Sequence, residues 1–255
     1  MTADTDRDVE ALRRIGHICS KTLNSMKHAA RAGMTTGALD DYGRQMLEQE
    51  GARSAPEVMY HYPGATCISV SPVIAHGIPG DHVLKLGELI HIDVSAELDG
   101  YYADTGESLI VPDEDGSPIP APDPELHRLL EATRATLHQA VSAARAGRPL
   151  NVIGQTVQLE ARKRGYQVIP ELTGHGIGHS LHEAPAEIWN VANPRDRRLL
   201  KEGAVLAIEP FLTTGLGRIR EMGDGWSLRT ADNAPAAQFE HTIIVRRGRP
   251  LLLTV

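Results

Sequence analysis

The stretch HIDVSAELDGYYADTG, residues 91–106, carries the strongest local fold signal in the chain. Two strand-like runs flank Asp99-Gly100, and an Asp-Gly pair is a preferred two-residue turn between antiparallel strands. With this turn, facing residues have numbers that sum to 199, so Asp93 and Asp104 become diagonal neighbours on one face. The sequence therefore predicts a hairpin with these two carboxylates roughly 7 to 8 Å apart at the backbone.

Two carboxylates at that distance repel each other unless a cation lies between them. For a hairpin taken alone, the alternative that both aspartates are solvated strand residues is the more common situation. A second polar cluster changes this balance. The segment GHGIGHSLHEAP, residues 174–185, contains three histidines, with small residues between them that allow the backbone to approach a ligand. A lone histidine is usually a packing residue, whereas three together favour a site.

Two glutamates interrupt otherwise apolar strands near the end of the chain. They are Glu209 in AVLAIEPF, residues 204–211, and Glu240 in AAQFEHTIIV, residues 236–245. A buried carboxylate without a partner is costly, so each predicts a partner or a metal. Alternation along the strand sends Glu240 and His241 to opposite faces, which makes Glu240 the better ligand candidate and His241 a structural one.

The combined side chains form an oxygen-rich ligand set with too few soft groups for a structural zinc site. Four carboxylates and one histidine can hold two divalent ions roughly 3.5 to 4 Å apart, and manganese, iron, cobalt or zinc would fit. We therefore predict hydrolysis by a metal-activated water. The predicted ligands are Asp93, Asp104, His175, Glu209 and Glu240.

Helices are expected around these strands. Apolar residues at steps of three and four predict an amphipathic helix over 9–33 and a second helix over 39–50, followed by strands at 66–70 and 89–95. The segment AARAG at 29–33 recurs 114 residues later. Two further residues repeat with that displacement: Gly51 as Gly165 and Pro56 as Pro170.

Two ordinary helix pairs with alanine-rich ends would explain these matches as well as a duplicated half-domain does. If the half-domain is duplicated, a site between the halves is expected, because pockets form where packed units meet. The segment over 112–124, rich in Pro and Asp, would then link the halves.

Composition limits the alternatives. A chain of 255 residues with 41% hydrophobic residues can bury one sizeable core or two small ones, so composition allows one or two domains. We predict a single domain over 1–255, with a flexible tail over 1–8. The net charge of -7 argues against direct nucleic-acid binding. Only two cysteines, no secretion signal and no run of roughly 20 apolar residues are present, so we expect a reducing cytoplasmic setting without membrane contact.

In chain order, six motifs resemble the methionine aminopeptidase family. They are HGIP at 76–79, the pair Asp93 and Asp104, GHGIG followed by HEAP, AIEP, DGWS and QFEHT. Each is weak alone, but together they are specific and extend from about residue 9 to the C-terminus. The resemblance implies a pita-bread fold, an α/β (α+β) domain with pseudo-twofold internal duplication, an antiparallel sheet flanked by helices, and metals in a central cleft.

The resemblance also assigns the ligands. By motif position, Asp93 would hold one metal, His175 and Glu209 would hold the other, and Asp104 and Glu240 would bridge both. The short spacing between the histidine motif and Glu209 leaves no room for the helical insertion of type II enzymes. The chain is therefore similar to type I.

Roles near the substrate follow from the same motifs. His182 would stabilise the developing oxyanion, His76 would contact the peptide on its leaving side, and Glu209 would accept a proton. The implied methionine pocket combines Tyr62, Cys67 and Trp226, which match the family, with Met59 and Leu181, which stand where aromatic residues are common. Ser71-Pro72 and Ala75 also depart from the family pattern. We expect the metal site to be retained and methionine selection to be weaker.

The implied activity is removal of the initiator methionine from nascent proteins and peptides, preferably before a small second residue. A monomer is expected, with the ribosome as a candidate partner. Proline-selective aminopeptidases and dipeptidases share the fold and the five ligands, but they usually carry a large N-terminal domain. A catalytically inactive pita-bread binding module is a further alternative, against which the intact ligand set argues.

Overall fold

The computed structural model describes residues 1–117 and 123–255, so 118–122 of the expected linker lie outside the described residues. The helices are α1 (Asp6–Ala29), α2 (Thr36–Gln49), α3 (Ala55–Tyr60), α4 (Pro124–Ala143) and α5 (Val152–Lys163). The strands of the first half are β1 (Arg53–Ser54), β2 (Cys67–Val70), β3 (Val73–Ala75), β4 (Leu89–Leu98) and β5 (Tyr101–Ile110). Those of the second half are β6 (Gln167–Val168), β7 (Gly174–Gly176), β8 (Glu183–Ile188), β9 (Val205–Ile208), β10 (Phe211–Thr213), β11 (Ile219–Glu221), β12 (Leu228–Thr230), β13 (Ala236–Gln238), β14 (His241–Ile244) and β15 (Leu251–Leu252).

The predicted hairpin is confirmed as the antiparallel pair β4 and β5. Its register places Asp93 opposite Gly106, as the sum of 199 requires. Asp99 and Gly100 both have positive φ, 53° and 82°, which suits a tight hairpin turn. Strands β1 and β2 pair with the other edge of β4 and complete a 4-stranded sheet. Asp93 and Asp104 therefore share a face of this sheet.

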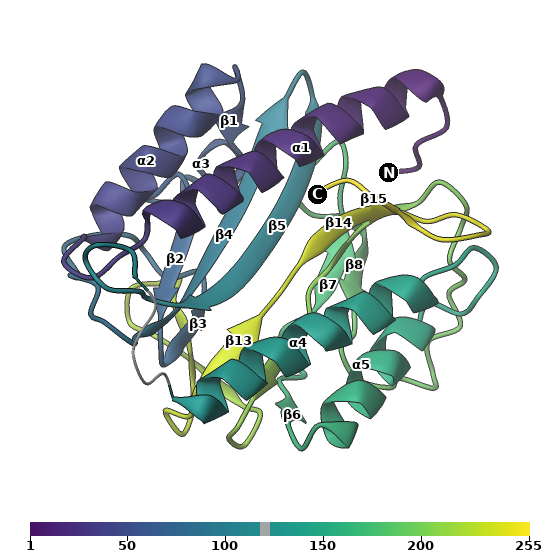
Figure 1. Cartoon of the computed structure of the whole chain (residues 1–255). Helices are drawn as coiled ribbons and strands as arrows, with labels where there is room; N and C mark the ends of the chain where they lie inside the picture. Colours follow the sequence, from purple (N-terminus) through teal and green to yellow (C-terminus); the bar gives the residue numbers. More distant parts are fainter. Residues whose placement is uncertain (118–122) are drawn as a thin grey trace.

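The second half repeats the first half's order of two helices and a short strand. Helix α4 ends 114 residues after α1, α5 ends 114 residues after α2, and β6 begins 114 residues after β1. Three equal displacements favour a duplicated half-domain over two unrelated helix pairs. In space, α1 lies across β4 and β5 while α4 lies along β13, so each half has helices outside its strands (Figure 1).

The two halves join where β5 runs beside the segment that connects β13 and β14. Glu107 and Phe239 form an isolated antiparallel bridge there, and the N–H of Glu240 donates to the carbonyl of Gly106 at 2.9 Å. The second half contains a 5-stranded sheet, β15-β14-β9-β7-β8, and a 3-stranded sheet, β13-β10-β6. Short breaks at 209–210 and 239–240 separate the strands that lead from one sheet into the other.

The N-terminal segment differs from the expected flexible tail over 1–8. Thr2 forms a β-bridge with Ala204, so backbone pairing ties this segment to the second half. Helix α1 also begins within the segment, because Thr5 caps it and Asp8 completes a reciprocal capping box. The Thr5 and Asp8 pair is a helix-start signal that the sequence itself contains, whereas the strand edge beside Ala204 arises only from tertiary contacts.

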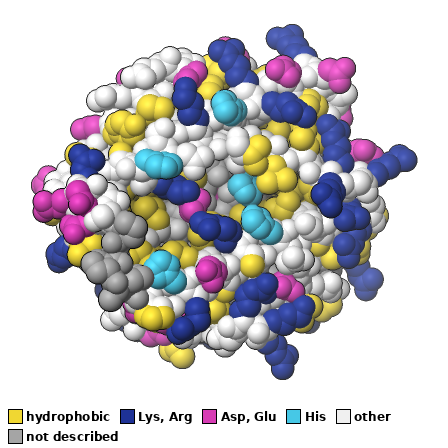
Figure 2. Space-filling view, in the orientation of Figure 1, with side chains coloured by type: hydrophobic (Ala, Val, Ile, Leu, Met, Phe, Trp, Pro, Cys, Tyr) yellow, Lys and Arg dark blue, Asp and Glu magenta, His cyan; other side chains and the backbone are white. Residues whose placement is uncertain are grey.

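The helices bury one side and present charge on the other. Helix α1 contributes Ile15, Cys19, Leu23 and Met26 to a cluster with Ile90 and other residues of the first sheet. Figure 2, in the same orientation, shows Lys and Arg side chains spread over the outer face of the helices, with hydrophobic side chains between them. Among the helices of residues 1–117 and 123–255, none combines the length and hydrophobicity needed to span a bilayer.

Candidate active site

A cavity of about 390 Å³ lies between the halves and contains the predicted cluster. All five predicted ligands line it: Asp93, Asp104, His175, Glu209 and Glu240. Six of the seven predicted substrate residues line it as well: Tyr62, Cys67, His76, Leu181, His182 and Trp226. Residues separated by more than a hundred positions thus meet in one cavity, as the duplicated half-domain predicts.

Backbone geometry explains how the ligands converge. Asp93 and Asp104 come from the neighbouring strands β4 and β5, and His175 is the middle residue of β7. Glu209 lies in the break between β9 and β10, and Glu240 lies in the break between β13 and β14. The glutamates that interrupt the apolar pattern therefore interrupt the strands themselves, which frees their side chains for the cleft.

The distances within the cluster suit ligands around an ion. Nε2 of His175 is 3.8 Å from Oδ2 of Asp104 and 3.6 Å from Oε1 of Glu209, which is too long for direct hydrogen bonds. Ligand atoms of Asp104, His175 and Glu240 lie within 4.8 Å of one another. Oδ1 of Asp104 and Oε1 of Glu240 are buried without a hydrogen-bond partner in the described part of the chain. Divalent cations would satisfy these orphaned oxygens.

The pKa values of the carboxylates also indicate that the cluster needs cations. Burial raises the pKa of Asp104 well above its ordinary value, and the charges of Glu240 and Asp93 raise it further. Burial likewise raises the pKa values of Glu209 and Glu240, with added repulsion from neighbouring carboxylates. Without cations the carboxylates would bind protons, because their charged forms are unfavourable in this cleft. The donor set fits divalent metal ions.

The raised pKa of Glu240 predicts how the stability of the metal-free protein depends on pH. The folded state keeps a proton on this group that the unfolded state releases, so its contribution to stability decreases as pH rises above 4.5, the ordinary pKa of the group. We expect metal-free Glu240→Gln, which cannot ionise, to gain stability relative to wild type over this range, by on the order of 1 kcal/mol. Urea unfolding of both proteins at several pH values measures this difference.

The stabilities of wild type and Glu240→Gln must be compared, because buried histidines change the stability of both proteins with pH in the opposite direction. Burial lowers the pKa of His91 to about 3 and that of His241 to about 4, so these rings favour the folded state as pH rises. Both proteins contain these histidines, and subtraction removes their contribution. A difference in stability that does not change with pH would contradict the prediction.

Hydrogen bonding determines which nitrogen of His175 faces the carboxylates. Nδ1 lies 3.0 Å from the carbonyl oxygen of Gly176, which can only accept, so Nδ1 carries the proton. Nε2 therefore offers its lone pair to an ion beside Asp104 and Glu209. Burial, with a smaller effect of His182, lowers the pKa of His175 to about 3, which keeps the ring neutral as a ligand must be.

The glycines beside His175 have a different role from the one expected. A Cβ atom at Gly174 would lie 2.4 Å from the carbonyl oxygen of Ala207, and one at Gly176 would lie 2.4 Å from that of Ala184. The small residues therefore allow β7 to pack tightly between β8 and β9. They position His175 by strand packing, and close approach to a ligand is not the reason for them.

The backbones of the two predicted bridging ligands are held by threonines. The Thr242 hydroxyl donates to the carbonyl of Asp104 at 2.7 Å and accepts from the N–H of Asp104 at 2.9 Å. The Thr105 hydroxyl donates to the carbonyl of Glu240 at 3.0 Å. Gln238, which the sequence did not single out, donates to Oε2 of Glu240 at 3.1 Å. These contacts fix Asp104 and Glu240 where β5 passes β14.

The apolar part of the cavity has aromatic and aliphatic walls. Tyr62 and Trp226 meet edge to face with ring centroids 5.1 Å apart, although they are far apart in the sequence. Cys67 and the buried Leu181 complete the pocket predicted for a methionine side chain.

Met59 is a correction to the predicted pocket. It does not line this cavity, and its sulfur instead accepts from the Tyr102 hydroxyl at 3.4 Å. Pro56 and Tyr60, one helical turn apart on α3, face the cavity in its place. The Ser54 cap and Pro56 signal a short helix, and its spacing would have identified Tyr60 as the pocket ring.

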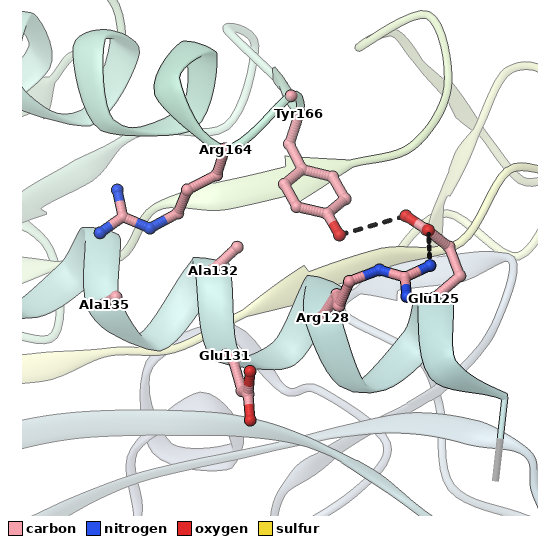
Figure 3. Close-up of a pocket in the computed structure, with 8 residues that line it drawn as sticks. Glu125, Arg128, Glu131, Ala132, Ala135, Arg164 and Tyr166 are labelled. Atoms are coloured by element: carbon pink, nitrogen blue, oxygen red, sulfur yellow. Dashed lines mark hydrogen bonds and ion pairs between the residues drawn. The ribbon is translucent and has the colours of Figure 1, made fainter.

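A second cavity, of about 520 Å³, lies beside α4 and the end of α5. Figure 3 shows Arg128 and Tyr166 converging on Glu125 at its wall. These charged and polar groups satisfy one another, and the cavity contains no part of the carboxylate and histidine cluster. Although larger, it is therefore the weaker candidate for catalysis.

The fold and the carboxylate cluster together define a metal-dependent hydrolase of the metallopeptidase class. The family model described as metallopeptidase family M24 matches residues 10–247, and the chain belongs to this family. Methionine aminopeptidase 2 of Bacillus subtilis (strain 168) is 43% identical over 255 residues, which covers 100% of this chain and 99% of that protein. Membership in this family and the buried ligand cluster support the use of divalent metal ions.

Solved structures agree with this placement. The crystal structure of methionine aminopeptidase from Rickettsia prowazekii has a TM-score of 0.92 and 32% identity, and each chain is covered to 100%. Prolidase from Pyrococcus furiosus has a TM-score of 0.77 and 19% identity, with 65% of its chain covered, so this likeness shows the fold alone. The resemblance to methionine aminopeptidases and the expected pita-bread fold are confirmed.

Proposed function

We propose that this chain is an aminopeptidase that removes the N-terminal methionine from proteins and peptides, preferably before a small second residue. The observation that carries the proposal is one cavity in which a buried carboxylate and histidine cluster adjoins an apolar pocket. The cluster fits the ions that hydrolyse a peptide bond, and the pocket fits an unbranched apolar side chain. The two parts together match an exopeptidase acting on a first residue.

We propose five metal ligands and two ions. Asp93 would hold one ion, His175 and Glu209 would hold the other, and Asp104 and Glu240 would lie between them. When bound, these ions would polarise the scissile carbonyl and lower the pKa of a water nucleophile. Cobalt, manganese, iron or zinc would each fit this oxygen-rich donor set.

The remaining roles belong to side chains at the edge of the cluster. Glu209 would accept the proton of the attacking water, since its carboxylate lines the cavity beside Nε2 of His175. His182 would donate a hydrogen bond to the developing oxyanion, an interaction worth roughly 3 to 4 kcal/mol in comparable sites. His76 would contact the substrate peptide on the leaving-group side of the scissile bond. Its backbone lies in the left-handed region, with φ of 54°.

The proline-selective alternative shares the fold but is the weaker assignment. The methionine aminopeptidases of Bacillus subtilis and Rickettsia prowazekii match at 43% and 32% identity, whereas the prolidase of Pyrococcus furiosus matches at 19%. An inactive binding module would have no need for buried, unpartnered carboxylates. Cytoplasmic location, a monomeric state and the ribosome as partner stay predictions.

A peptide panel after metal reconstitution tests the function. Peptides that begin with Met, Ala or Leu are compared, with small, bulky and proline second residues. The proposal expects the highest kcat/KM for Met before Ala, Ser or Gly. Faster release of Ala, or cleavage confined to peptides with a proline second residue, would reject it.

Because Leu181 gives the pocket an aliphatic wall, we expect the enzyme to prefer methionine over leucine as the first residue of a peptide only moderately. An aliphatic wall adapts to different guests, and hydrophobic pockets separate such near-isosteres by only roughly 1 to 3 kcal/mol even when well formed. Met59 was expected to deprive the pocket of an aromatic wall, but the ring of Tyr60 supplies one. The expectation of weaker selection for methionine therefore depends on Leu181 alone. We expect Leu181→Phe to raise the ratio of kcat/KM for Met-Ala-Ser over Leu-Ala-Ser by about threefold to tenfold. An unchanged ratio would show that Leu181 does not set selectivity.

A further inference from the structure

Tyr60 and His182 form a contact across the cleft. The Tyr60 hydroxyl oxygen is 2.8 Å from Nδ1 of His182, and the ring centroids are 5.7 Å apart at an angle of 57°. Tyr60 ends α3 in the first half, while His182 immediately precedes β8 in the second half. Both side chains line the cavity of the metal cluster. The contact therefore holds a predicted catalytic ring from the opposite wall.

His175 provides a comparison, because its ring lies 4.0 Å from that of His182. The Nδ1 partner of His175 is the carbonyl oxygen of Gly176, which can only accept a hydrogen bond. The proton of His175 is thus on Nδ1, and its Nε2 has a free lone pair. That tautomer is the one a metal ligand needs.

The Nδ1 partner of His182 has the opposite capacity. A tyrosine hydroxyl can donate its proton, and a neutral imidazole nitrogen is a good acceptor. Among the described residues, the Tyr60 hydroxyl has no other protein acceptor, so donation to Nδ1 gives its proton a partner. A neutral imidazole carries a single ring proton. With Nδ1 accepting, that proton is on Nε2.

We propose that Tyr60 is a positioning residue that holds His182 with its proton on Nε2, ready to donate to the substrate. Two adjacent histidines then have opposite tautomers, a lone pair on His175 for the metal and an N–H on His182 for the oxyanion. The inference rests on the proposed function, because that function assigns the donor role to His182. It adds a role for the Tyr60 hydroxyl, which acts through His182 and is separate from the place of the Tyr60 ring in the pocket wall.

The first test is long-range 1H–15N NMR of the metal-free protein at about pH 8, which reports the protonated nitrogen of each ring. Wild type should show His182 protonated at Nε2 and His175 protonated at Nδ1. In Tyr60→Phe, which keeps the ring but loses the hydroxyl, His182 should become a mixture of tautomers. His175 should not change, and it serves as a control within the same spectrum.

The second test is kinetic, on the metal-loaded enzyme. Tyr60→Phe should lower kcat for Met-Ala-Ser by about tenfold, with KM within about twofold and metal content unchanged, since one hydrogen bond to the donor is lost. Tyr102→Phe is the matched control. It also removes a hydroxyl that contacts α3, through the sulfur of Met59, but it leaves His182 untouched. Its kcat should stay within about twofold of wild type.

The outcomes separate the two proposals. Protonation of His182 at Nδ1 in wild type, or the same tautomer ratio in Tyr60→Phe, would overturn the role of Tyr60 whatever the activity. A lower kcat with an unchanged tautomer would also overturn it, because Tyr60 would then act by another route. If no Met peptide is cleaved by reconstituted wild type, the proposed function fails, while the spectrum of metal-free protein still decides the tautomer.

Discussion

Chelation should abolish peptidase activity, lowering it by at least about a hundredfold, and manganese, cobalt or iron should restore it. The physical reason is the composition of the cluster. Asp93, Asp104, Glu209 and Glu240 offer carboxylates, and burial with mutual repulsion raises the pKa of Asp104 and of both glutamates. A bare cluster of this kind contains no activated nucleophile, whereas divalent ions neutralise the repulsion and acidify water.

The measurement combines activity with elemental analysis of the same samples. Two ions per chain are expected at full activity, and activity should follow metal content during reconstitution. Asp40→Asn is a suitable control, because Asp40 is another buried aspartate but accepts hydrogen bonds from Ala65 and Thr66, away from the cavity. This variant should bind metal as wild type does. Full activity in protein verified to be metal-free would exclude the two-metal mechanism.

The second large effect is expected for His182→Ala. Its proposed hydrogen bond exists mainly in the transition state, so kcat should fall by roughly a hundredfold or more while metal content stays near wild type. His175→Ala is the contrasting variant. Nε2 of His175 lies among the carboxylate oxygens of the cluster, so this change should reduce both metal occupancy and activity.

Comparing the two variants separates a substrate-contacting histidine from a ligand. Their rings are neighbours, with centroids 4.0 Å apart, so a general disturbance of the site would affect both alike. Equal loss of metal in both variants would show that His182 is itself a ligand. Retention of metal and kcat in His182→Ala would remove it from the mechanism.

The amino-acid sequence alone determined the elements that depend on neighbouring residues. The Asp99-Gly100 turn fixes the hairpin register because its backbone conformation permits one pairing, which aligns Asp93 and Asp104 on a common face. Glu209 and Glu240 were recognisable because a carboxylate within an apolar strand needs a partner. The repeat of helix ends at a displacement of 114 likewise reflects local helix signals present twice in the chain.

Other features depended on contacts between distant segments. The N-terminal segment was expected to be a tail, but it finds a strand edge at Ala204 that its own residues do not reveal. Met59 was assigned to the pocket by its position in a motif, whereas the turn of α3 directs Tyr60 to the cavity. The glycines beside His175 serve strand packing, which no local pattern distinguishes from ligand approach.

The protonation of the two neighbouring histidines is the clearest case of tertiary control. Sequence identifies His175 and His182 as members of one cluster, but it cannot distinguish a ring that offers a lone pair from one that offers a proton. That difference comes from what each Nδ1 meets, a carbonyl of its own strand for His175 and a hydroxyl from the other half for His182. Residue types and local spacing determined which groups are present. The packing of the two halves decided the direction of their hydrogen bonds, because the tautomer of a histidine depends on the hydrogen-bond partner that its ring nitrogen meets.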